Sequence, residues 1–194
     1  DVVMGHVVPV YETGPTPWIV RGKYFERRRF PTGTQIVHAA TCNTIVRASV
    51  IADVGSFDER YALNGGDDTQ FFMRALARGV KMEYCAEAVV REKVPADRMR
   101  VSWLLRRSFR SGNGIAHAEF DVSPGIRSRV RRAIRVVGQL MIGGVVGTIA
   151  APFAVSDRTR YVAVRWWRLA ARGMGGAAAM WGGMVAGYAE VQGR

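Results

Sequence analysis

The sequence predicts an α/β domain followed by hydrophobic helices, and three features carry this prediction. Short β-rich runs bounded by glycine, proline and polar residues predict strands in the first half of the chain. Apolar residues at helical spacing between two of these runs predict an amphipathic helix. Two long uncharged segments, residues 136–155 and 173–189, predict hydrophobic helices near the C-terminus. The 194 residues are 48% hydrophobic and 23% charged, so the chain can build a core and does not have a disordered composition.

The first part of the chain is expected to alternate strands with turns. Residues 2–10 predict a strand. Residues 11–31 predict a loop or a loosely helical excursion, because they hold several Gly and Pro residues and a basic run. Residues 34–46 predict a second strand that ends in a polar turn. Residues 48–54 are expected to form a short helix that ends at Gly55.

An amphipathic helix is predicted for residues 67–78, with an apolar stripe and with Gly79 as its C-terminal stop. The stripe comprises Phe71, Phe72, Ala75 and Leu76. Residues 81–90 predict a further strand. A helix is then expected from about residue 96 to residue 110, with its end in the Ser-Gly-Asn-Gly segment 111–114.

Charge is distributed unevenly, and this divides the chain into an α/β part, residues 1–120, and a basic, hydrophobic helical part, residues 121–194. The second part carries 11 Arg against 3 acidic residues, whereas the first carries 17 Lys and Arg against 13 acidic residues. Such an excess suits nucleic acid, anionic lipid or a phosphorylated substrate. Arginine clusters that alternate with uncharged stretches favour lipid, and no nucleic-acid-binding motif is present, so we expect no nucleic-acid partner.

Two adjacent carboxylates, Asp67 and Asp68, follow Gly65 and Gly66 at the start of the predicted helix. Bare glycine backbone lets a substrate approach closely, and neighbouring like charges raise at least one carboxyl pKa, which suits a general base. The alternative is that both carboxylates only cap the helix, where its dipole favours anions. Spacing alone leaves both interpretations open.

Residues 54–79 resemble the signature of family 2 glycosyltransferases: a Gly-Phe-Asp-Glu-like turn, an acidic pair and a hydrophobic helix that ends in Arg-x-Gly. The wider resemblance covers about residues 2–110 and is to the bacterial exopolysaccharide branch of succinoglycan-biosynthesis type. Cys42 stands where that branch has glycine. The segments that carry the resemblance are Thr41-Cys42-Asn43, Gly65-Gly66-Asp67-Asp68-Thr69, Val94-Pro95-Ala96-Asp97-Arg98 and Trp103-Leu104-Leu105-Arg106-Arg107.

The resemblance implies the C-terminal half of a GT-A domain and inverting transfer of a sugar from a nucleotide-sugar donor to a glycan or lipid-linked acceptor. It places the catalytic base on Asp68, with Asp67 in support in place of the usual Glu. The family holds Mg or Mn through an Asp-x-Asp motif that this chain lacks, so we expect no metal bound by this chain alone. The chain starts directly in a strand-like run, and we therefore expect the donor-binding half to precede Asp1.

Substrate contacts are implied at two places. The resemblance implies that the sugar of the acceptor or donor is lined by Thr41, Asn43, Gly65 and Gly66. Trp103, Arg106, Arg107 and Arg110 share one face of the helix predicted after Pro95. That face is expected either to close over the diphosphate or to be a solvated or lipid-facing basic surface.

The C-terminal part predicts membrane association. Residues 136–155 are long enough to cross a bilayer, but both flanks are basic, which also allows a re-entrant or interfacial hairpin, or a buried helix pair. Gly-x-x-x-Gly spacings at 143–147 and 183–187 would let two helices pack closely. We expect anionic lipids as partners and the cytoplasmic face of the inner membrane as location. The alternative function is a non-catalytic membrane-surface interaction module or remnant.

Overall fold

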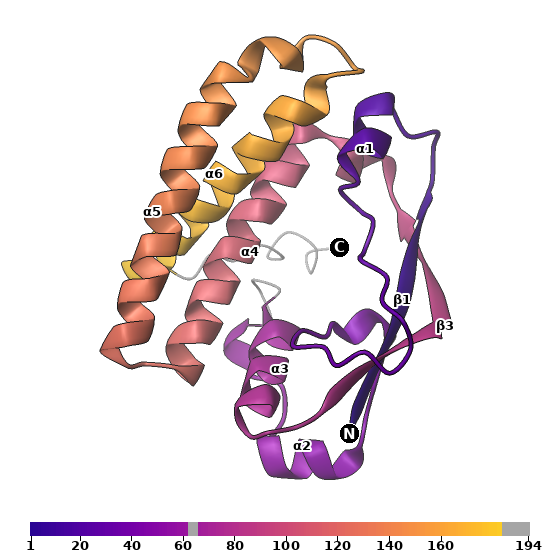
Figure 1. Ribbon diagram of the computed structural model, residues 1–194, viewed down its shortest axis with the longest axis vertical. Helices are drawn as coiled ribbons and strands as arrows, with labels where there is room; N and C mark the ends of the chain where they lie inside the picture. Colours follow the sequence, from indigo (N-terminus) through magenta and orange to yellow (C-terminus); the bar gives the residue numbers. More distant parts are fainter. Residues whose placement is uncertain (62–65, 184–194) are drawn as a thin grey trace, which may run out of the picture.

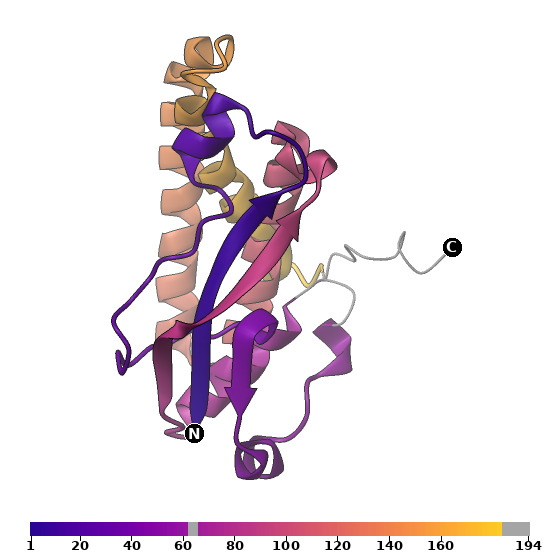
Figure 2. The same cartoon turned by 90° about the vertical axis from the view of Figure 1, so that its right-hand side faces the viewer.

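The computed structural model describes residues 1–61 and 66–183. A small twisted sheet with two short helices forms one part of the molecule, and three long helices lie side by side along it (Figure 1). The view turned by 90° shows the two long strands crossing in front of the helical layer (Figure 2). The prediction of an α/β part followed by helices is confirmed at this level, and among the described residues one of these helices, Ile126–Ile149, is apolar enough to cross a membrane.

The sheet has three strands in the order β2-β1-β3. β1 (Val2–Tyr11) pairs in parallel with β3 (Met82–Val94) and antiparallel with the short β2 (Thr44–Val46). The register between β1 and β3 shifts after Gly5, so that His6 pairs with Val89. The predicted first and last strands are thus confirmed, and the last one runs four residues further than expected.

The predicted strand over residues 34–46 is wrong for most of its length. Its first residues lie along β3, where the N–H of Ile36 donates to the Met82 carbonyl at 2.9 Å and the N–H of Tyr84 donates to the Thr34 carbonyl at 2.9 Å. The segment then leaves the sheet and forms a 3₁₀ turn, η1 (Thr41–Asn43), before β2 begins. The polar turn therefore precedes the strand instead of ending it.

α2 (Ala48–Val54) and α3 (Asp67–Ala77), both predicted as helices, cover one face of the sheet. Gly55 and Gly79 end these helices with positive φ values of 88° and 78°, which favour glycine. Leu76 departs from the expected apolar stripe because it is 40% exposed. The buried cluster between the helices and the sheet includes Val2, Val50, Val54, Phe71, Phe72, Ala75, Met82 and Tyr84.

The chain returns from the sheet through η3 (Ala96–Met99) into α4 (Val101–Val122). The predicted helix end at residues 111–114 is wrong, because α4 continues through them. A Cβ added to Gly112 would lie 2.0 Å from the Arg172 carbonyl oxygen on α6 (Arg160–Met180). The glycine therefore allows two helices to pack closely, and it does not break the one that contains it.

The helical layer is completed by α5 (Ile126–Ile149), which pairs with α6 as an antiparallel hairpin through η4 (Ala151–Ala154). Gly143 and Gly147 face α6, since added Cβ atoms would lie 2.4 Å from the Ala170 nitrogen and 2.7 Å from the Trp167 ring. The close approach predicted from this spacing is confirmed, whereas residue 187 of the second spacing lies outside the described residues.

The loop expected at residues 11–31 contains a helix, α1 (Pro17–Gly22), that packs on α6. Trp18 and Ile19 of α1 are buried against Leu104 of α4 and Val164 of α6. This second cluster ties the N-terminal part of the chain to the helical layer. Since α4 lies against α6, the layer combines residues from both sides of residue 120, and the division of the chain there stays a prediction.

Candidate functional site

The acidic pair lies at the N-terminus of α3. The Asp68 carboxylate accepts hydrogen bonds from the backbone N–H of Thr69 at 2.6 Å and from its hydroxyl at 3.2 Å. The backbone N–H of Thr41 lies close enough to the same carboxylate to lower its pKa. The first residue of η1 and the first turn of α3 thus hold one carboxylate between them.

Partial burial of the Asp68 side chain raises its pKa above the ordinary value for aspartate, and the charge of Asp67 raises it further. The hydrogen bonds from Thr69 and the nearby N–H of Thr41 act in the opposite direction, because they favour the ionised form. A carboxylate of this kind is oriented by fixed donors and yet holds a proton more tightly than an exposed aspartate. Both properties suit a general base.

Neither carboxylate of the acidic pair caps α3 from the N-cap position. The N-cap residue of α3 is Gly66, and no side chain makes the cap hydrogen bond there. Asp68 instead binds the N–H of its own neighbour and lies close to that of Thr41. Both carboxylates still lie in the first turn, where the helix dipole favours negative charge.

The segment before the acidic pair is fixed to α3 by Arg74. Its guanidinium donates to the carbonyl oxygens of Val54 at 2.7 Å and Ser56 at 2.6 Å, and the ring of Phe57 stacks on Phe71 at 4.5 Å between centroids. The Gly-Ser-Phe-Asp turn and the helix that carries Asp68 therefore form one packed unit. These contacts explain why glycine, phenylalanine and arginine recur at fixed spacing within residues 54–79.

The turn is also tied to the end of α4. Asp58 pairs with Arg60 at 2.7 Å, and Arg60 pairs with Asp121 at 3.0 Å. The hydroxyl of Tyr61, in η2 (Glu59–Tyr61), donates to Asp121 at 2.8 Å. Both ends of the segment that approaches Gly66 are thus anchored, one on α3 and one on α4.

Asn43 has a role that the sequence does not reveal. Its side-chain NH₂ donates to the carbonyl oxygens of His6 and Ala88, each at 2.9 Å, and so bridges the register shift between β1 and β3. A Cβ at Gly5 would lie 2.1 Å from the Ala88 oxygen and 2.4 Å from the Asn43 amide nitrogen. Asn43, the last residue of the turn that contains Thr41, therefore holds β1 and β3 together at their register shift.

The N-terminal end of the predicted basic face of α4 packs against the buried cluster that contains Trp18 and Ile19. The ring of Trp103 packs 5.9 Å from Phe25, and the guanidinium carbons of Arg98 and Arg107 lie 5.6 Å and 5.3 Å from its centroid. Trp103 belongs with the cluster near α1. Arg106 is exposed and Arg110 half-buried. Asp68 thus lies close to Thr41, the substrate contacts expected at the Trp103–Arg110 face stay a prediction, and Gly65 lies outside the described residues.

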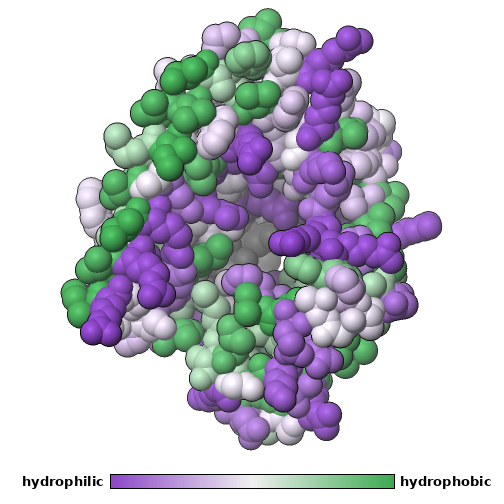
Figure 3. Space-filling model, viewed as in Figure 1, coloured by the Kyte–Doolittle hydropathy of each residue, from purple (hydrophilic) through white to green (hydrophobic). Residues whose placement is uncertain are grey.

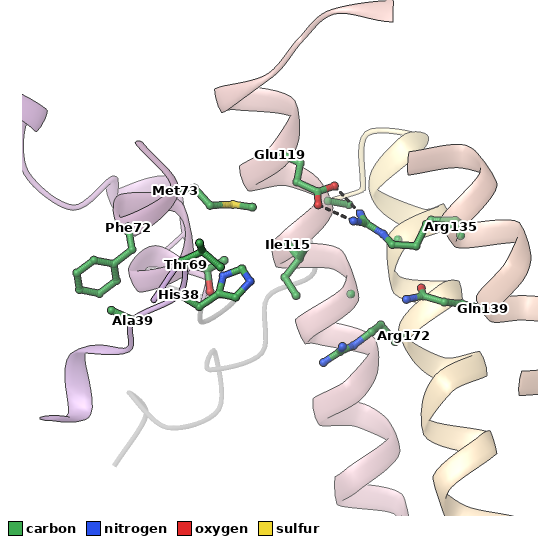
Figure 4. Close-up of a pocket in the computed structure, with 15 residues that line it drawn as sticks. His38, Ala39, Thr69, Phe72, Met73, Ile115, Glu119, Arg135, Gln139 and Arg172 are labelled. Carbon is green, nitrogen blue, oxygen red and sulfur yellow. Dashed lines mark hydrogen bonds and ion pairs between the residues drawn. The ribbon is translucent and has the colours of Figure 1, made fainter. Parts of the chain in front are cut away.

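A cavity of about 450 Å³ lies between α3 and the helical layer. Figure 4 shows Thr69, Phe72 and Met73 on its α3 side and the Glu119–Arg135 ion pair on the other, with Arg172 nearby. Thr69 connects this cavity to Asp68 through its hydrogen bonds. Sequence reasoning missed Thr69, His38 and Arg172 as lining residues, because they come from three separate segments that only the fold brings together.

Metal ligation has no candidate within residues 1–61 and 66–183. In these ranges no group of three or more His, Cys, Asp or Glu side chains is placed to hold an ion. The side chains described here therefore do not fit a metal centre, and no catalytic step below passes through one. The metal of a complete enzyme stays an expectation from the resemblance.

Comparison with known proteins finds a relative that is named for succinoglycan biosynthesis. The chain is 30% identical over 128 residues to the succinoglycan biosynthesis protein ExoM of Rhizobium meliloti (strain 1021). The match covers 64% of this chain but 41% of the relative, so the chain spans less than half of that protein's length. No family model matches the chain. No solved structure matches it either.

Proposed function

We propose that this chain is the acceptor-side, catalytic-base part of an inverting GT-A glycosyltransferase that works in exopolysaccharide assembly. The observation that carries the proposal is the Asp68 carboxylate, held by Thr41 and Thr69 at the start of α3 and raised in pKa by burial. The similarity to a succinoglycan biosynthesis protein supports the process. The resemblance of residues 54–79 to the family 2 signature supports the reaction.

In the proposed reaction, Asp68 accepts the proton of an acceptor hydroxyl while that oxygen attacks the anomeric carbon of the donor sugar. The new C–O bond forms as the bond to the nucleoside diphosphate breaks, and the anomeric configuration inverts. Asp67 adds negative charge next to the base, which favours its protonated form as the proton arrives. The donor-binding part is proposed to belong to a segment outside this chain.

The experiment that tests this function measures sugar transfer. The full-length product of the reading frame that encodes this chain is incubated with labelled UDP- and GDP-sugars and a lipid extract as acceptor. Transfer of label that depends on Asp68 supports the proposal. Full transfer by an Asp68→Asn enzyme contradicts the assignment of Asp68 as the base, and no transfer by the unaltered enzyme favours the alternative, a non-catalytic module.

The transfer rate is expected to fall on the acid side at a higher pH than an ordinary aspartate would cause. Because burial raises the pKa of Asp68, the ionised base is present above that raised pKa and is lost as the pH falls through it. A profile of log(kcat/KM) against pH measures this limb. An acid limb centred at or below the usual aspartate range would contradict the assignment of Asp68 as the base.

We further propose that the chain binds the surface of the inner membrane on its cytoplasmic side through α5. This helix is long and apolar enough to cross a bilayer by length and composition, yet only 22% of its most apolar window is buried. An exposed stripe runs along its whole length, and hydrophobic residues gather there in Figure 3. The stripe consists of Ile126, Val130, Ile134, Val137, Met141, Ile142, Val145 and Ile149.

Charge supports an orientation along the membrane plane. Arg127, Arg129 and Arg131 are exposed at the start of α5, and Arg158 and Arg160 lie after its end. A spanning helix would place arginines on both sides of the bilayer, whereas a helix in the interface keeps all of them at one anionic surface. The anionic lipids expected as partners would pair with these arginines.

A double variant with Met141→Gln and Val145→Gln is expected to bind vesicles more weakly, by about tenfold for each substituted side chain. Each substitution removes apolar contact with acyl chains. Flotation with vesicles of phosphatidylcholine and phosphatidylglycerol measures this. Ile45→Gln, at a still more exposed aliphatic residue on β2, is the matched control and should float like the unaltered chain. Equal binding by all three proteins would contradict the proposal for α5.

A further inference from the structure

Arginines from three helices gather where α4, α5 and α6 meet. A second cavity of about 270 Å³ lies between α4 and α6 and is lined by Ser108, Arg165, Trp166, Arg168, Leu169 and Arg172. Arg172 lines this cavity and also the larger one beside α3. The two cavities are therefore neighbours that share one guanidinium group.

Positive charge in this region exceeds the negative charge that faces it. Glu119 pairs with both Arg132 and Arg135, at 3.3 Å and 2.5 Å, so its carboxylate is already used. Among the described residues, neither Arg168 nor Arg172 lies within ion-pair distance of an acidic side chain. Cations held together without an acid between them attract an anion.

The pKa shifts of Arg168 and Arg172 agree with an excess of positive charge in this region. Partial removal from water lowers the pKa of Arg168, and the charges of Arg107 and Arg172 lower it further, against an opposing contribution from Tyr24. Partial removal from water, followed by the charge of Arg135, lowers the pKa of Arg172. A bound anion would relieve the repulsion between these side chains.

Hydroxyl groups stand next to both arginines. Arg168 Nε donates to Ser108 Oγ at 3.1 Å, and an Arg172 amino group donates to Ser111 Oγ at 3.4 Å. Each hydroxyl that accepts such a bond keeps its own O–H to donate. Guanidinium and hydroxyl donors side by side match the several oxygens of a phosphate group.

We propose that Arg168 and Arg172, with Ser108 and Ser111, bind the phosphate or diphosphate group of a substrate. The site adjoins the predicted Trp103–Arg110 face, since Ser108 and Ser111 lie on the same helix and the charge of Arg107 acts on Arg168. It also lies next to the cavity that Thr69 shares with the acidic pair. The identification of the anion as a substrate group rests on the proposed function. The shared chemistry is a diphosphate, carried either by a nucleotide or by a lipid.

The test is calorimetry of the 194-residue chain at low salt with inorganic diphosphate, UDP and farnesyl diphosphate. Inorganic diphosphate should bind, and the affinity should fall as salt rises. Arg172→Gln should weaken diphosphate binding about tenfold through loss of charge-assisted hydrogen bonds. The affinity of Arg172→Lys should lie between those of the unaltered chain and Arg172→Gln. Arg131→Gln, at an exposed arginine on α5 outside both cavities, is the matched control and should bind normally.

The comparison of ligands identifies the source of the group. Tighter binding of farnesyl diphosphate than of UDP assigns the site to a lipid-linked substrate, and the reverse order assigns it to the nucleotide. Equal affinities assign recognition to the diphosphate alone. No binding of inorganic diphosphate, or an equal loss in Arg131→Gln, overturns the proposal. Asp68→Asn should bind normally, so this test can fail while the proposed reaction stands, or the reverse.

Discussion

Asp68→Asn is expected to slow sugar transfer about 10²- to 10⁴-fold, the usual contribution of a general base. The amide can accept the same hydrogen bonds from Thr69 as the carboxylate does, but it cannot accept a proton from the acceptor hydroxyl. The loss should therefore appear in kcat, with the KM for the donor little changed. Initial rates with labelled sugar nucleotides and the full-length protein measure both quantities.

The same substitution should not destabilise the fold at neutral pH. Burial raises the pKa of Asp68 above its unfolded value, so its ionised form is less favourable in the folded chain, and the group lowers stability once the pH rises above that pKa. An uncharged isostere removes this effect, and the melting temperature at pH 7 should stay equal or rise.

Asp67→Asn is the matched control for the activity of Asp68→Asn and should lose less activity. Equal losses for both variants would show that the two carboxylates share the role.

Gly175→Ala is expected to lower the free energy of unfolding by about 2–3 kcal/mol, as overpacked helix contacts do. Its Cβ would lie 1.9 Å from the Phe109 carbonyl oxygen and 2.9 Å from the Asn113 backbone nitrogen, so α4 and α6 would have to move apart. Backbone atoms cannot turn aside as a flexible side chain can. Urea denaturation followed by circular dichroism measures the change.

Gly144→Ala supplies the control with the opposite sign. Gly144 lies in α5 with nothing within 4 Å of an added Cβ, so alanine should stabilise the helix by about 0.5–1 kcal/mol through its higher helix propensity. Both changes are Gly→Ala within a long helix. A similar effect on stability at the two positions would contradict the packing of α4 against α6.

The sequence predicted those helices whose first and last residues are determined by neighbouring residues in the chain. α3 begins at the acidic pair and ends at a glycine with positive φ, and both signals stand in the sequence itself. Gly112 contributed to a wrong prediction of a helix end, because α6 approaches it so closely at Arg172 that only glycine fits there. The strand expected at residues 34–46 failed for a related reason, since only part of that segment finds a partner along β3.

The candidate site could be predicted only in part from the sequence. The family pattern singled out Asp68, and the fold adds its contact with Thr41. The amide of Asn43 binds two backbone carbonyl groups of the sheet, and the sugar contact expected of this residue stays a prediction. Arg168 and Arg172 were read as part of a basic flank of a membrane segment. Their spacing of four places them on one side of a helix, but only the packing of α6 against α4 shows what lies beside them.

The proposed role of Asp68 in exopolysaccharide assembly is tested most directly in cells, because that test needs no knowledge of the donor sugar. The gene that encodes this chain is deleted, and the sugar and linkage composition of the cell-surface polysaccharide is measured after complementation with the wild-type gene or with Asp68→Asn. We predict that the wild-type gene restores the polymer and that Asp68→Asn does not, at equal protein levels. Restoration of the polymer by Asp68→Asn would contradict the assignment of Asp68 as the catalytic base.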